Sequence, residues 1–80
     1  MMARFTRHAC NRLRLYRLSS ETATLVAEHP DSVTPSYYGR TNAWKRLEGG
    51  LLCVTYIDEG DERVIITLTH RRRGPGETGS

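Results

Sequence analysis

The second half of the chain alternates hydrophobic and β-branched residues with polar ones around a polar turn. Two such runs flank Asp58-Glu59-Gly60-Asp61, which predicts a β-hairpin with strands at residues 51–58 and 62–70. A further strand is expected at residues 40–47. It joins the hairpin through a tight turn at Gly49-Gly50. These strands form a predicted antiparallel meander.

The lengths of the two turns predict which side chains share a face. A two-residue loop at Gly49-Gly50 would pair Leu47 with Leu52, and a three-residue loop at residues 59–61 would pair Tyr56 with Val64. Alternation then predicts a more apolar face that packs on helices: Ala43, Lys45, Leu47, Leu52, Val54, Tyr56, Val64, Ile66, Leu68 and His70. The other face is expected to be partly open: Trp44, Arg46, Leu51, Cys53, Thr55, Ile57, Arg63, Ile65, Thr67, Thr69 and Arg71.

Helical spacing dominates the first half of the chain. Ala9, Leu13 and Tyr16 recur four and three positions apart, which predicts a helix over residues 7–17. Ser19 is a predicted N-cap for a second helix, with Glu21 in its first turn, and this helix ends before a proline near residue 30. Residues 3–6 fit either a strand or the entry to the first helix, and residues 31–38 read as a connector.

Together these elements predict one α+β domain over residues 1–73. Two N-terminal helices pack on one face of a three- to four-stranded antiparallel sheet, in the order (β)ααβββ. Residues 74–80 have nothing to bury, which predicts a disordered tail. The chain lacks the run of roughly 20 apolar residues that spans a bilayer, so no membrane partner is expected. Cys10 and Cys53 suggest neither a disulfide framework nor a metal site, which favours the cytoplasm.

Charge adds a functional indication, because the net charge of +3 comes with arginines clustered near both ends. Such clusters suit phosphates or an acidic partner. His8 and Arg12 lie one helical turn apart, and His70 ends the last predicted strand. No metal or other cofactor is expected, because His8, His29 and His70 lack ligand spacing.

The order of several short motifs resembles a bacterial domain family of unknown function grouped with RelE/ParE-like and BrnT-like toxins. The matching segments, from about residue 5 to residue 73, are HAxxRLxxYRLS, HPDSV, YYGR, WKRLEGGLLCVTY and DERVIITLTHRR. The resemblance implies a RelE-like fold. It also implies a toxin-antitoxin function as a metal-free endoribonuclease, with RNA or the ribosome as target and an acidic antitoxin-like protein as partner.

RNA cleavage without a metal needs proton transfer and stabilisation of phosphate charge, which histidine and arginine supply. The catalytic candidates are His8, Arg12 and His70. The substrate-binding candidates are Arg40, Lys45, Arg46, Arg71 and Arg72. Two other interpretations stay open. One is a non-catalytic module that binds RNA or a protein through the same arginines. The other is an interaction protein that dimerises through a sheet edge and Trp44.

Overall fold

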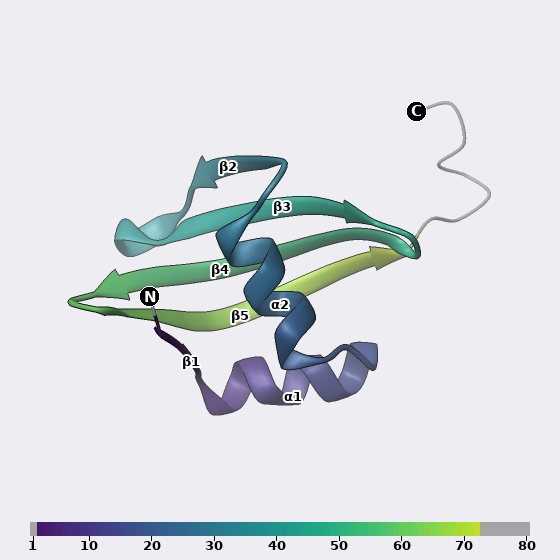
Figure 1. Cartoon of the computed structure of the whole chain (residues 1–80), viewed down its shortest axis with the longest axis horizontal. Coiled ribbons are helices and arrows are strands. Elements are labelled where there is room, and N and C mark those ends of the chain that lie inside the picture. The colour runs from purple at the N-terminus through teal and green to yellow at the C-terminus, as the bar shows by residue number, and fades with distance from the viewer. Residues whose placement is uncertain (1, 73–80) are drawn as a thin grey trace.

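Two helices and one mixed five-stranded sheet make up the fold, in a computed structural model that describes residues 2–72 (Figure 1). The strand order in the sheet is β1-β5-β4-β3-β2. The elements are β1 (Met2–Phe5), α1 (Arg7–Tyr16), α2 (Ser20–Glu28), β2 (Ser32–Pro35), a 3-10 turn (Tyr37–Gly39), β3 (Thr41–Leu47), β4 (Gly50–Glu59) and β5 (Glu62–Arg72). The α+β class is confirmed, and the predicted tail at residues 74–80 lies outside the described residues.

Both helices begin at capping side chains. The Thr6 hydroxyl accepts a hydrogen bond from the Ala9 N–H at 3.1 Å and donates one to the Ile66 carbonyl at 2.8 Å, which ties α1 to β5. Ser19 caps α2 as predicted, because its hydroxyl accepts from the Thr22 N–H at 3.1 Å. The capping chemistry therefore sets where each helix starts.

The sheet differs from the expected three- to four-stranded antiparallel arrangement, which is not confirmed. β1 pairs in parallel with β5, from Met2 opposite Glu62 to Phe5 opposite Ile65. β2 occupies part of the expected connector and pairs antiparallel with β3 at the other edge. Neither short edge strand carries a strong local pattern, so their pairing depends on partners elsewhere in the fold.

The turn between β3 and β4 lies one residue earlier than predicted. Leu47 pairs with Gly50, and Lys45 pairs with Leu52, so the predicted pairing of Leu47 with Leu52 is wrong by two positions. Gly50 is the first residue of β4 and not part of the loop. Its φ of 146° is a conformation that only glycine adopts readily. A shift of two positions preserves alternation, and the predicted faces of β3 and β4 therefore hold.

The turn between β4 and β5 also differs, and here the faces change. Glu59 pairs with Glu62, which leaves a two-residue loop instead of the predicted three. Tyr56 then pairs with Ile65, while Thr55 pairs with Thr67, so Ile66 is the extra residue of a β-bulge. The predicted core face was therefore wrong for part of β5. Arg63 and Ile65 face the helices in place of Val64 and Ile66, and beyond the bulge Leu68 and His70 face them as predicted.

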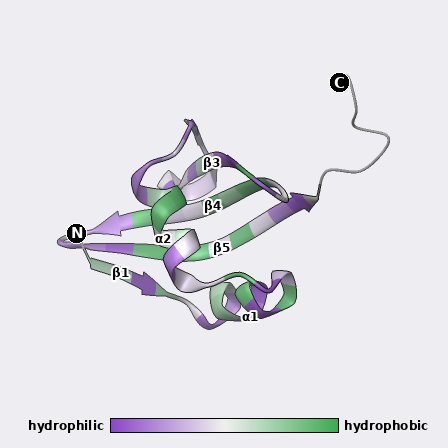
Figure 2. Ribbon diagram, turned by 45° about the vertical axis from the view of Figure 1, so that its right-hand side comes forward, coloured by the Kyte–Doolittle hydropathy of each residue, from purple (hydrophilic) through white to green (hydrophobic). Residues whose placement is uncertain are grey.

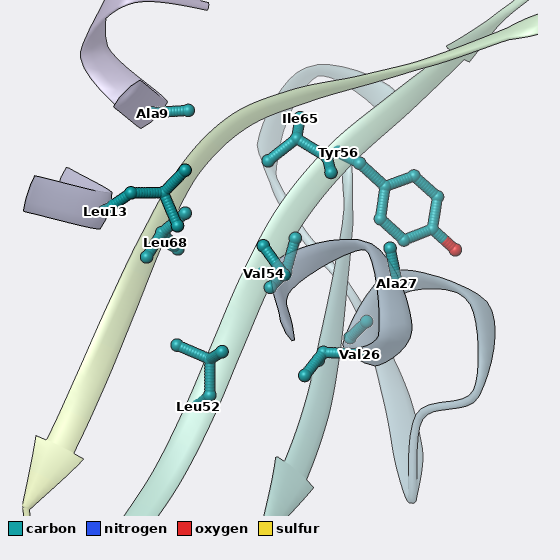
Figure 3. Close-up of a cluster of buried hydrophobic side chains, with 11 residues drawn as sticks. Ala9, Leu13, Val26, Ala27, Leu52, Val54, Tyr56, Ile65 and Leu68 are labelled. Atoms are coloured by element: carbon teal, nitrogen blue, oxygen red, sulfur yellow. The ribbon is translucent and has the colours of Figure 1, made fainter. Parts of the chain in front are cut away.

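The core lies between the helices and this face of the sheet (Figure 3). Small residues on both helices let them approach the strands closely, and Ala9, Ala23 and Val26 are completely buried. The full cluster is Ala9, Leu13, Ala23, Val26, Ala27, Ala43, Leu52, Val54, Tyr56, Ile65 and Leu68. Burial of this apolar surface fixes how the helices sit on the sheet.

Polar side chains link the C-terminal end of α2 to β3. The Lys45 ammonium donates to the His29 carbonyl at 3.0 Å, where a cation suits the negative end of the helix dipole. Lys45 also pairs with Asp31 at 3.4 Å, and the Arg46 N–H donates to the other Asp31 oxygen at 2.9 Å. That backbone hydrogen bond holds the pKa of Asp31 below its ordinary value, with Lys45 and Arg46 adding attraction.

Acid should weaken the fold through Asp31 and Asp58. The Arg63 hydrogen bond likewise lowers the pKa of Asp58. A carboxylate with a depressed folded pKa contributes stability above its unfolded pKa of about 3.9, and loses it as the pH falls through the folded value. The urea midpoint should therefore drop between about pH 5 and pH 2. In the Asp31→Asn, Asp58→Asn double variant the midpoint should start lower and fall less, and an equal fall would contradict this origin.

Candidate nucleic-acid interface

One face of the sheet carries no covering element among residues 2–72, because both helices lie on the other face (Figure 1). The strand register places Arg46, Leu51 and Arg71 side by side in a row across β3, β4 and β5. The next row holds Trp44 and Cys53. Two arginines and the chain's single tryptophan therefore share this surface, which we call the open face.

Along β3 the open face presents three alternate residues: Asn42, Trp44 and Arg46. Hydrogen bonds hold two of these side chains in place. The Trp44 indole N–H donates to the Thr34 hydroxyl at 3.0 Å, and the Asn42 carbonyl oxygen accepts from the Thr55 hydroxyl at 2.7 Å. We call these three residues the β3 stripe, and they form an ordered surface before any ligand arrives.

The β2 and β4 residues that flank the β3 stripe contain no carboxylate, although the Asp31 carboxylate just before β2 accepts a hydrogen bond from the Arg46 N–H. The flanking positions are Ser32, Thr34, Leu51, Cys53 and Thr55. Burial raises the pKa of the Cys53 thiol, which keeps it protonated and unreactive. The hydropathy colouring shows the hydrophilic end of β5, where Arg71 lies (Figure 2). The surface is thus cationic and aromatic, as nucleic-acid surfaces often are.

A second feature, the α1–β5 pocket, lies on the helix side of the sheet at the end of β5. Its volume is about 510 Å³, and it is lined by Leu15, Tyr16, Arg17 and His70. The rings of Tyr16 and His70 lie 5.9 Å apart at an angle of 60°. Arg12 stacks over Tyr16 at 5.7 Å and donates to its hydroxyl at 3.3 Å. The pocket therefore combines aromatic walls with cationic groups.

The three predicted catalytic residues do not form one site. Arg12 and His70 both contact Tyr16. His8 is exposed in the first turn of α1, and the helix rise places the backbone of Tyr16 roughly 12 Å beyond that of His8. The structure therefore brings Arg12 and His70 together at Tyr16 and places His8 near the other end of α1.

The predicted substrate-binding residues also separate into groups. Arg46 and Arg71 belong to the open face. Arg40 precedes β3 and stacks over Tyr38 at 5.8 Å. Lys45 points to the helix side, where it bonds to the end of α2. Arg72 pairs with Gly50. The open face thus gathers two of the five predicted residues.

Three of the four pocket residues, Leu15, Tyr16 and Arg17, are not among the site residues predicted from the sequence. Tyr16 was assigned to the core face of α1, and it does pack against the core while its ring also reaches His70. Arg17 was assigned to the helix itself, although it lies just past the end of α1. The only signal in the sequence was an aromatic residue followed by arginine at a helix end.

Within residues 2–72 no group of histidine, cysteine and acidic side chains is placed to hold a metal ion. Neither of the two helices described has the length and apolar character that crossing a membrane requires. No protein-family model, curated protein or solved structure gave a match to this chain.

Proposed function

We propose that this chain is a RelE/BrnT-like toxin-family domain that binds single-stranded RNA and acts as a metal-free endoribonuclease of a toxin-antitoxin module. The observation that supports it is the row of Arg46, Leu51 and Arg71 beside Trp44 on the open face. The toxin grouping itself rests on the resemblance of the sequence motifs.

Each part of the open face suits one part of a nucleotide. Arginine forks bind phosphate oxygens through paired hydrogen bonds, which fits Arg46 and Arg71 on either side of Leu51. The partly exposed indole of Trp44 offers a surface on which an unpaired base can stack. Asn42 adds an amide beside it. These contacts favour a single strand, because a duplex keeps its bases stacked inside.

Cleavage would take place where the strand meets His70. Neutral His70 would accept the 2′-hydroxyl proton as this oxygen attacks the phosphorus, and the imidazolium so formed would give that proton to the leaving 5′-oxygen, which leaves a 2′,3′-cyclic phosphate and a 5′-hydroxyl. Arg12 brings positive charge to the His70 side through Tyr16, and Arg71 would hold the strand on the opposite face of β5. His70 is the proton-transfer candidate in this proposal, and His8 is not.

Binding can be tested with the fluorescence of Trp44, the chain's single tryptophan. A short oligouridylate should quench it. The Arg46→Gln, Arg71→Gln double variant should bind about 30-fold more weakly, and its salt slope should fall by about 1.4, since each phosphate contact contributes about 0.7 for a single strand. Arg14→Gln on the exposed side of α1 is the matched control and should change affinity little. An equal loss of affinity in the double variant and in Arg14→Gln would refute a specific role for the open face.

Cleavage is tested separately with labelled mRNA, free and on ribosomes. His70→Ala should abolish cleavage while oligouridylate still quenches Trp44, and His8→Ala should keep both activities. Intact RNA after incubation with the unmodified protein would refute the proposed nuclease activity.

The separation of His8 from His70 favours a second candidate, a non-catalytic RNA- or protein-binding module of the same fold. The same arginines suit an acidic antitoxin-like protein, which would compete with RNA for the open face. This candidate predicts quenching of Trp44 by RNA or by an acidic partner, with no cleavage by any variant.

A further inference from the structure

We propose that the α1–β5 pocket binds one nucleotide of the RNA strand held on the open face. This inference rests on the proposed function and adds a defined subsite to it. The base would lie against the rings of Tyr16 and His70, and the phosphate would meet Arg17.

The size and walls of the pocket suit this ligand. Its volume of about 510 Å³ is in the range of small-ligand sites, roughly 300–1,000 Å³. Leu15, Tyr16 and His70 give it apolar and aromatic surface, on which a base of any sequence can stack. Arg17 provides the cation that a phosphate requires.

The backbone conformation of Arg17 supports a ligand site independently of the size and lining of the pocket. Arg17 follows α1 with φ 56° and ψ 45°, the left-handed conformation in which helices usually place glycine. Its N–H closes the helix by bonding to the carbonyls of Leu13 and Arg14. A long side chain at such a position is a strained choice, and strained residues concentrate at ligand sites.

Arg12, which stacks on the Tyr16 ring of the pocket wall, gives a further indication of a ligand site. Its Nε is buried and has no hydrogen-bond partner within the described residues, although its NH1 group donates to the Tyr16 hydroxyl. Buried donors are nearly always paired, so this nitrogen is a candidate to pair when a ligand or water enters.

The route from the open face to the pocket is short. His70 and Arg71 are consecutive in β5, so their side chains leave opposite faces of one strand. β1 pairs with β5 only as far as Ile65, so in the described structure no strand covers the β5 edge beyond it. An RNA strand bound at Arg71 can therefore pass around this edge to His70.

The test is an NMR titration with uridine 5′-monophosphate, following the imidazole signals of His8, His29 and His70. Only the His70 signal should shift strongly. Arg17→Gly should weaken binding about tenfold, the loss expected for one charged contact, with an unchanged or higher Tm because glycine relieves the left-handed backbone. Tyr38→Gly is the matched control, since Tyr38 is also left-handed at φ 58° but lies outside the pocket. It should bind normally.

The two proposals fail in different ways. Unchanged affinity in Arg17→Gly, or equal shifts at all three histidines, would overturn the pocket while quenching of Trp44 by oligouridylate still supported the open face. Binding of the mononucleotide at His70 without any quenching of Trp44 by the oligonucleotide would overturn both the open face and the path of the strand.

Discussion

Replacing Ile65 with alanine is expected to destabilise the domain by about 3–4 kcal/mol, whereas the same change at its neighbour Ile66 should cost about 1 kcal/mol or less. Ile65 is completely buried between the helices and the sheet. Ile66 is only partly buried and is the extra residue of the β-bulge. The two isoleucines are neighbours on one strand, so they form a matched pair in which the register alone sets the difference in burial.

Urea denaturation followed by far-UV circular dichroism measures both changes. A loss of this size is a large part of the stability of a small domain, so Ile65→Ala can be mostly unfolded. Ile65→Val, expected to cost about 1 kcal/mol, provides a variant that still folds. A larger loss for Ile66→Ala than for Ile65→Ala would mean that β5 lacks the bulge and follows the simple alternation predicted from sequence.

Replacing Arg63 with methionine is expected to cost about 2–3 kcal/mol, because one side chain makes three kinds of contact. Its guanidinium forms paired hydrogen bonds to Asp58 at 2.8 and 3.1 Å. It donates to the Ala27 carbonyl at the end of α2 at 2.8 Å, and it stacks over Tyr56 at 4.1 Å. Methionine keeps the apolar stem but leaves the Ala27 carbonyl and the Asp58 carboxylate without this partner.

Two variants separate geometry from charge. Arg63→Lys keeps the charge but cannot make the paired and stacked contacts together, so it should lose most of the same stability. Arg71→Met lies on the same strand in an exposed position, and should change stability by about 0.5 kcal/mol or less. Thermal unfolding of the three variants at one pH measures the order of their stabilities. A loss of stability for Arg71→Met as large as for Arg63→Met would contradict this account.

The parts of the fold that local pattern could predict are the helices and the meander. Helical spacing of Ala9 and Leu13, and the Ser19 cap, act over a few residues, and both helices formed where expected. The β-branched runs of β4 and β5 likewise carry their own signal.

The edges and the bulge could not be predicted in this way. A bulge adds one residue to a strand, and nothing in the Val64-Ile65-Ile66 run marks which isoleucine is the extra one. The parallel pairing of β1 depends on a partner at the far end of the chain. Local pattern contains no information on such a pairing.

The candidate site was predictable by residue type but not by arrangement. Arg46 and Arg71 are both on the predicted open face, and the structure adds that Leu51 lies between them. Lys45 was correctly placed on the helix face, yet its bond to the His29 carbonyl was not foreseen. Arg17 entered the α1–β5 pocket only because α1 ends one residue earlier than expected.

The contact of the first strand and helix cap with β5 has a consequence for how the chain folds. Thr6 bonds to Ile66, 60 residues later, while the β3–β4 and β4–β5 turns join neighbours. Local hairpins close quickly, whereas distant contacts pay a larger loop-closure entropy first. We expect the meander to form early and the N-terminal strand to dock late. During synthesis on the ribosome, β1 would therefore emerge well before β5 and yet pair only after β5 has been made.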